Sequence, residues 1–295
     1  MLKILNSKRR AVIALTTAAA ILLAAFLSWH FIPKAIKTAA KPEGVFVPII
    51  MYHSICCDDD MLCDYVISPE TLEKDIVYLK KNGYCPVFVR ELIDFVHCGG
   101  ELPPKPVIIS FDDGFYNNLT QVLPLLEKYD FKATISVVGS YTEKSDEHSD
   151  RSERYSYLTS EEISELFNSG LVEIGNHSYD MHSLDKRQGC GIMKGESYED
   201  YRNAFLSDIK KTQDYLSDNC SIAPQVFTYP YGIVSEPSLR LVKSAGFQAS
   251  LGVEEKPNYI TSDPDCLYRM FRYNRPSGVL TEKFMEKALD PLHNM

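Results

Sequence analysis

The chain has 295 residues, of which 45% are hydrophobic and 24% are charged. These proportions are those of a globular protein, so they exclude a collagen, a low-complexity chain and a wholly disordered protein. The formal net charge of −9 is unevenly spread: residues 1–44 carry seven basic groups and one acid, a net of +6, which leaves −15 for the remainder. Because an acidic body of this size repels polyphosphates, we expect no nucleic-acid partner.

The N-terminal part of the sequence predicts a membrane segment. Residues 11–29 contain no charged side chain, and the apolar character resumes at 31–32. About 20 such residues cross the hydrocarbon layer as a helix, and the basic residues Lys8, Arg9 and Arg10 before them predict a cytoplasmic N-terminus. A cleaved signal peptide ending near Ala40, and hence a secreted protein, is the alternative. We expect a cytoplasmic basic tail at 1–10, a single-pass transmembrane signal anchor in the cell membrane at 11–32, a linker at 33–44 and an extracellular domain at 45–295.

Short apolar runs alternate with amphipathic segments along this domain. Helix start signals stand at Ser68-Pro69-Glu70, in the capping box Thr159–Glu162, and at Ser235-Glu236-Pro237. Helical spacing extends over 197–216, and the polar segment 141–157 is expected to be a long loop. The alternation predicts an α/β fold with a mainly parallel sheet, open or closed into a barrel. The expected strands are 47–52, 84–89, 106–111, 132–138, 171–176, 225–229, 247–251 and 267–272.

Polar residues follow several of these strands, at the edge where α/β folds carry their chemistry. Asp112 and Asp113 follow the apolar run at 106–111, and adjacent like charges are unfavourable unless a cation or a proton joins them. His177 and His182 follow the run at 171–176. Two neutral imidazoles and one carboxylate suit a divalent ion and leave positions open for water and substrate. Taken singly, the carboxylate pair is equally compatible with a solvated turn at the end of a strand, and a histidine pair on a loop is more often incidental than a metal site.

Two further clusters end strands. Tyr229-Pro230-Tyr231-Gly232 follows the run at 225–229, and His53 follows the run at 47–52. Beside a metal ion the aromatic rings could stack on a sugar, and a backbone N–H could serve an oxyanion. Alone, the first cluster is a packed turn and the second a structural histidine.

Three of these motifs together carry a family resemblance. Ser-Phe-Asp-Asp-Gly at 110–114, His-Ser-x-x-x-His at 177–182 and Pro-Tyr-Gly at 230–232 resemble those of the polysaccharide deacetylases, the NodB-homology enzymes of carbohydrate esterase family 4. The resemblance covers roughly 45–275, and it makes 45–295 a polysaccharide deacetylase domain. It implies a distorted (β/α) barrel of about seven strands, one divalent metal ion, most often Zn²⁺, and removal of N-acetyl groups from N-acetylglucosamine-containing cell-surface polysaccharide or peptidoglycan.

The resemblance also implies a role for each matching position. Asp112 corresponds to the catalytic base, and Asp113, His177 and His182 correspond to the metal ligands. The backbone amide of Tyr231 corresponds to the donor that holds the oxyanion.

The general acid is expected at an unusual place. Four residues separate His177 from His182, a spacing that resembles the branch acting on poly-N-acetylglucosamine. In that branch the last motif is circularly permuted to the first strand, within a Met-Tyr-His sequence. His53 of Met51-Tyr52-His53 matches it, and we expect a neighbouring acid to raise the pKa of His53.

The sequence departs from the pattern of the family at one more position, and this bears on the expected substrate contacts. Thr228 stands where many relatives have an arginine that pairs with the base, so Arg269 or Arg272 is expected to replace it. Tyr229, Pro230 and these arginines form the expected substrate-binding set. Two alternative functions remain open: an O-acetyl esterase with the same metal site, and a catalytically silent, membrane-tethered glycan-binding protein.

Overall fold

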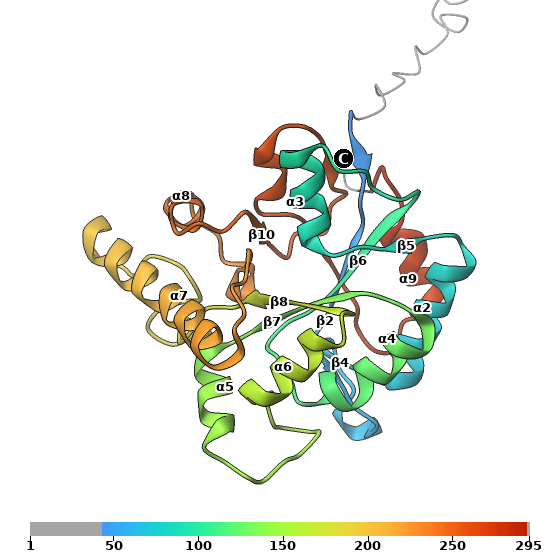
Figure 1. Cartoon of the computed structure of the whole chain (residues 1–295), viewed down its shortest axis with the longest axis horizontal. Coiled ribbons are helices and arrows are strands. Elements are labelled where there is room, and N and C mark those ends of the chain that lie inside the picture. The colour runs from blue at the N-terminus through green and yellow to red at the C-terminus, as the bar shows by residue number, and fades with distance from the viewer. Residues whose placement is uncertain (1–42, 294–295) are drawn as a thin grey trace, which may run out of the picture. The chain divides into compact units, whose positions relative to one another are not determined.

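The computed structural model describes residues 43–293, and parallel strands form the centre of this part of the chain (Figure 1). Their order is β10-β9-β8-β7-β6-β2-β12, and β5 pairs with the start of β6. The bounds are β2 Ile49–Tyr52, β5 Cys85–Pro86, β6 Pro106–Phe111, β7 Ala133–Val137, β8 Val172–Asn176, β9 Val226–Thr228, β10 Ala249–Leu251 and β12 Tyr273–Asn274.

The segment after β10 links the two edges of this sheet. Leu251 at the end of β10 forms a parallel bridge with Met270, and β12 a few residues later pairs with β2. The sheet is therefore a distorted, half-closed barrel of parallel strands, which confirms the expected α/β class. The strand expected at 267–272 is wrong in its position, because Asp263 caps a 3-10 turn at Pro264–Leu267 and regular pairing starts only at Tyr273.

The central strands are covered on both of their faces. Every residue of β2, β6, β7 and β8 is buried, as expected for parallel strands that carry helices on the outside. One large core cluster lies around Ile109, Phe111 and Ile135. A second lies around Ile49 and Ile108, on the other side of the same strands.

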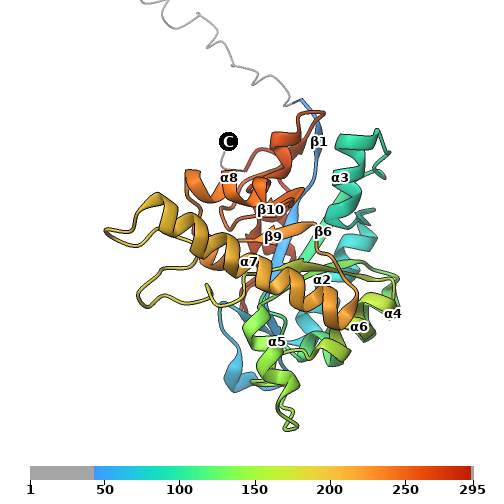
Figure 2. The same ribbon diagram turned by 60° about the vertical axis from the view of Figure 1, so that its left-hand side comes forward.

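Helices pack around the sheet (Figures 1 and 2). The Ser68 hydroxyl accepts from the Thr71 amide, and capping boxes stand at Thr159 and Ser235, so the three predicted helix starts are confirmed. Within 141–157 the structure differs from the expected loop. Helix α5 occupies the first part of this segment and packs against α7. The polar composition of the segment gave no sign of a helix. The helices are α2 Pro69–Lys81, α3 Val89–Cys98, α4 Leu123–Tyr129, α5 Gly139–Asp146, α6 Ser160–Asn168, α7 Tyr198–Cys220, α8 Glu236–Ser244 and α9 Thr281–Ala288.

Shorter elements complete the part described. Two small sheets join β1 (Val45–Phe46) to β11 (Tyr259–Ile260) and β3 (Ser54–Ile55) to β4 (Val66–Ile67). A π-helical turn, η2, spans Asn118–Val122, and further 3-10 turns lie at Asp59–Met61 and Pro230–Gly232. Between residues 43 and 293 no helix is long and apolar enough to cross a membrane. The predicted transmembrane segment at 11–32 lies outside the described residues.

Candidate active site

Three potential metal ligands meet at the carboxyl edge of the sheet. Asp113 follows β6, His177 follows β8, and His182 lies in the loop after it. Asp113 Oδ1 is 3.0 Å from His182 Nε2 and 3.5 Å from His177 Nε2. One ligand atom from each of the three lies within 4.8 Å of the other two. The structure thus brings together the three residues that the sequence singled out, two of them about 65 positions from the third.

The hydrogen bonds behind the two histidines aim both Nε2 atoms at Asp113. His177 Nδ1 lies 2.8 Å from the Thr228 carbonyl oxygen, and because a carbonyl only accepts, Nδ1 carries the proton. Tyr141 donates its hydroxyl to the His182 carbonyl at 3.3 Å, which leaves the hydroxyl oxygen to accept from His182 Nδ1 at 3.4 Å. Each Nε2 therefore keeps its lone pair for a ligand.

The donor set fits a divalent cation. Asp113 Oδ1 is buried without a hydrogen-bond partner, a costly arrangement for a carboxylate unless a cation compensates it. Burial by itself raises the pKa of Asp113, but the contacts of His177 and His182 hold that pKa well below its ordinary value. A carboxylate with two imidazoles is a ligand set that suits Zn²⁺ and related ions and leaves coordination positions open.

The neighbouring Asp112 is held by a buried arginine. Arg272 Nη1 and Nη2 donate to the two carboxylate oxygens at 2.6 and 2.7 Å, and Arg272 Nε donates to the Gly252 carbonyl at 2.7 Å. Burial raises the pKa of Asp112, but the Arg272 guanidinium, helped by His177 and His53, brings the pKa below its ordinary value. Of the two arginines that the sequence offered as a partner for Asp112, the structure places Arg272 there.

His53 enters the same pocket from the end of β2. Its Nε2 lies 4.0 Å from Asp112 Oδ2, and its ring makes an edge contact with Tyr65, with centroids 4.9 Å apart. Contrary to expectation, the pKa of His53 is lowered. Burial is the largest cause of this lower pKa, and together with Arg272 and His177 it outweighs Asp112 and Asp113, which raise the pKa.

The substrate contacts expected from the sequence are only partly accessible. Tyr229 has no exposed surface and packs edge-on against Phe227, with ring centroids 5.0 Å apart, and Pro230 is also buried. Arg272 is equally inaccessible, so it contacts Asp112 and not a substrate. Arg269 pairs with Glu254 and lines a separate hollow beside α8.

Tyr231, by contrast, faces the pocket. Its side chain is 42% exposed, and its ring lies 4.6 Å from that of His182. The residue adopts a left-handed backbone with φ of 55°. Outside the helices and strands of residues 43–293, no backbone carbonyl accepts the Tyr231 N–H.

These groups line a pocket of about 560 Å³, a volume in the range of small-molecule sites. Its lining includes the acidic and histidine side chains described above, namely His53, Asp112, Asp113, His177 and His182. Much of its wall is apolar or aromatic and comes from segments far apart in the sequence. Apart from Met51, which belongs to the Met-Tyr-His motif, no local sequence signal marks these residues: Tyr65, Val66, Phe115, Leu184 and Val253.

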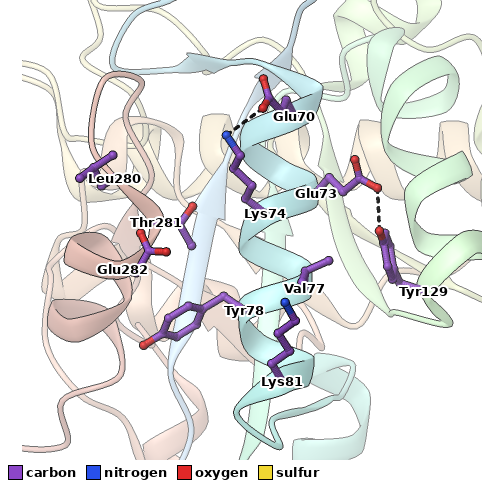
Figure 3. A pocket seen from close by; sticks show the side chains of 10 residues that line it. All are labelled: Glu70, Glu73, Lys74, Val77, Tyr78, Lys81, Tyr129, Leu280, Thr281 and Glu282. Atoms are coloured by element: carbon purple, nitrogen blue, oxygen red, sulfur yellow. Dashed lines mark hydrogen bonds and ion pairs between the residues drawn. The ribbon is translucent and has the colours of Figure 1, made fainter.

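A second hollow, of about 590 Å³, lies between α2 and the start of α9 (Figure 3). Two of its charged side chains form an ion pair, Lys74 with Glu70 at 2.8 Å, and the Tyr129 hydroxyl donates to Glu73 at 2.6 Å. Its lining includes no histidine or cysteine. It therefore offers no catalytic or metal-binding set.

Comparison with known proteins finds similar polysaccharide deacetylases. The curated relatives include poly-beta-1,6-N-acetyl-D-glucosamine N-deacetylases of Staphylococcus aureus strain MRSA252, 26% identical over 193 residues, and of Escherichia coli K12, 26% identical over 260 residues. The matches cover 65% and 80% of this chain, but only 63% and 38% of the relatives' own lengths.

Solved structures share the fold. A de-N-acetylase from Aggregatibacter actinomycetemcomitans superposes with a TM-score of 0.69 at 22% identity, covering 81% of this chain and 100% of that one. IcaB from Ammonifex degensii superposes with a TM-score of 0.67 at 21% identity, covering 83% and 97%. The family model described as polysaccharide deacetylase matches residues 99–250, about half of the sequence. The chain therefore belongs to the polysaccharide deacetylase family.

Proposed function

We propose that this protein is a metal-dependent hydrolase that removes N-acetyl groups from a glycan rich in N-acetylglucosamine, of the poly-β-1,6-linked type. The arrangement of Asp112, Asp113 and His53 in one pocket carries the proposal: an arginine-held carboxylate, a potential metal site and an imidazole line the same cavity. The names of the curated relatives support the substrate class.

Asp113, His177 and His182 would hold the metal ion. When bound, a divalent cation supplies Lewis-acid polarisation of the acetyl carbonyl and makes a water molecule more acidic. Asp112 then acts as general base and takes the proton of the attacking water. Arg272 keeps this carboxylate ionised and fixes the direction of both oxygens. The Tyr231 N–H donates to the oxygen on which negative charge develops.

His53 supplies the proton that the departing amine needs. Because burial favours the neutral imidazole, His53 must gain a proton before it can give one. Asp112 Oδ2, 4.0 Å from His53 Nε2, is placed to pass on the proton taken from water, since a carboxylic acid is the stronger acid of the two. The amine leaves as an uncharged group and becomes cationic in solution.

The two alternative functions differ in their dependence on His53. An O-acetyl esterase would use the same general base, but its alkoxide leaving group needs a proton donor less than an amine does. A silent binding protein needs no proton donor at all. The position of His53 in the pocket with Asp112 supports an enzyme over a silent binding protein. Amide hydrolysis has the greater need of the acid, which favours the N-deacetylase.

Acetate release tests the proposal. The protein is incubated with a panel of N-acetylglucosamine oligomers, β-1,6-linked and β-1,4-linked, with peptidoglycan and with an O-acetylated glycan. Each substrate is tested with a chelator and after metal is restored. We expect release from the β-1,6-linked oligomers that stops with chelator and returns with Zn²⁺. Release from the O-acetylated glycan alone would identify the esterase, and no release from any substrate would favour the binding protein.

We also propose that residues 11–32 tether the domain to the outer face of the cell membrane. The uncharged apolar run and the basic residues before it support this arrangement. Membrane fractionation with protease treatment of intact cells tests it. A membrane-bound, protease-accessible full-length chain is expected, and a shorter soluble form in the medium would favour cleavage.

A further inference from the structure

The turn that follows the catalytic aspartates has an unusual geometry. In η2 the Leu123 amide donates to the Asn118 carbonyl, five residues back. Pro124 accounts for the wider winding: it has no N–H for the carbonyl four residues earlier, that of Thr120, and its ring crowds that carbonyl. Such π-helical turns are rare in proteins, and those that do occur often lie at functional sites.

Two asparagines at the start of this turn are attached to the backbone next to His53. Asn118 Nδ2 donates to the His53 carbonyl at 3.1 Å. Asn117 Oδ1 accepts from the Ile55 amide at 3.0 Å, and Asn117 Nδ2 donates to Ser54 Oγ at 2.8 Å. Both asparagines have no exposed surface. Three consecutive residues after β2 are thus fixed to the turn that begins five positions after Asp113.

The backbone matters here because the His53 ring has few other polar contacts. His53 Nδ1 is buried and has no hydrogen-bond partner in the described part of the chain. No hydrogen bond at Nδ1 therefore fixes the direction of the His53 ring, whereas the Thr228 carbonyl oxygen and the Tyr141 hydroxyl contact Nδ1 of the two metal-site histidines. The hydrogen bond from Asn118 to the His53 carbonyl is a polar contact of residue 53 itself, and it bears on where Nε2 lies relative to Asp112.

We propose that Asn118 is a positioning residue for the general acid: its side-chain amide holds the backbone of His53 so that Nε2 faces Asp112 and the leaving amine. The proposal rests on the role assigned to His53 above. A displacement of about 1 Å at a reacting group costs on the order of 10²-fold in rate. Losing this contact should therefore lower amide hydrolysis roughly 10- to 100-fold.

The variant Asn118→Leu tests this, because leucine has a similar branched shape but no donor. It is compared with the wild type on an N-acetylglucosamine oligomer and on an activated aryl acetate, whose leaving group needs no proton. We expect a selective loss on the amide, with the aryl acetate rate close to that of the wild type. Asn118→Ser serves as a second variant if the leucine does not fold, and melting temperatures check both.

Thr120→Val is the matched control. Thr120 lies in the same turn and its hydroxyl has no hydrogen-bond partner among the described residues, so its removal should change neither rate. An equal loss in Thr120→Val would show that any change in the turn impairs the enzyme, and it would overturn the specific role of Asn118.

A double-mutant cycle with His53→Ala separates positioning from a general structural effect. If Asn118 acts through His53, Asn118→Leu has no further effect in the His53→Ala background. Additive losses, or equal losses on both substrates by Asn118→Leu, would overturn the inference. If His53→Ala itself lowers both rates equally, the assignment of the general acid fails instead, so the two failures are distinguishable.

Discussion

Replacement of Arg272 by methionine tests the buried ion pair that holds the proposed base. Methionine keeps an unbranched side chain of similar length but removes the two hydrogen bonds to Asp112 and the bond to the Gly252 carbonyl. Asp112 is then left as a buried charge without a partner. Breaking a buried pair in this way costs about 3–5 kcal/mol, and for a domain of this size that is a fall of roughly 6–20 °C in melting temperature.

Activity should fall as well, because Asp112 loses the contact that fixes its direction. We expect acetate release to drop on the order of 10²-fold, while the metal stays bound through Asp113, His177 and His182. Thermal unfolding, metal analysis and acetate release on the same preparation measure the three quantities.

Arg269→Met is the matched control for this change. Arg269 lies three residues earlier and pairs with Glu254 at the surface, with a side chain 45% exposed. Exposed pairs of this kind contribute about 0–1 kcal/mol, so stability and turnover should stay close to the wild type. Equal effects of Arg269→Met and Arg272→Met, or an Arg272→Met variant with normal stability and turnover, would refute the reasoning.

Three further changes address other parts of the site and the fold. Asp112→Asn should keep the metal, as judged by metal analysis, and lower turnover roughly 10²–10⁴-fold; loss of the metal would mean that Asp112 and Asp113 have exchanged roles. The double variant Tyr141→Phe/Tyr231→Phe removes both hydroxyls near His182 Nδ1 and should weaken metal affinity about 10–100-fold in competition with a chelator; unchanged affinity would contradict this. Asp75→Leu leaves the fully buried Arg275 without the carboxylate it now contacts at 2.7 Å. The free energy of unfolding, measured in urea, should fall by about 3–5 kcal/mol. A fall below about 1 kcal/mol, the contribution of an exposed pair, would contradict this.

The clustering of the site residues was predictable from the sequence for a physical reason. In a parallel sheet all carboxyl ends lie at one edge, so polar residues directly after apolar runs share that edge. Asp113, His177 and His53 each follow such a run, and the structure places all three in one pocket. The helix starts were equally predictable, since Ser68 and Thr159 cap through local hydrogen bonds.

Contacts that depend on tertiary packing were not predictable. Nothing local distinguishes Arg269 from Arg272. Arg272 is the partner of Asp112 because the bridge between Leu251 and Met270 brings Arg272 beside Gly252 and Asp112. The expected direction of the His53 pKa shift was also wrong, because burial is the largest cause of the shift and lowers the pKa, and burial is a property of the folded pocket.

The aromatic turn shows the same limit. Tyr229 and Tyr231 are two residues apart and chemically alike, yet the first packs into the core and the second is exposed at the pocket. The left-handed backbone at Tyr231 turns the chain at that point. The sequence predicted the turn but could not tell which ring it would bury.

A metal titration of the full chain tests the central claim most directly. The protein is stripped with chelator, and bound Zn²⁺ and acetate release from a β-1,6-linked N-acetylglucosamine oligomer are measured on the same samples as metal is restored. The account predicts that release rises in proportion to bound metal and saturates at one ion per chain, and that His182→Ala neither retains the ion nor releases acetate, because two protein ligands rarely hold zinc against water. Full acetate release by the stripped protein, or full metal occupancy and turnover in His182→Ala, would contradict it.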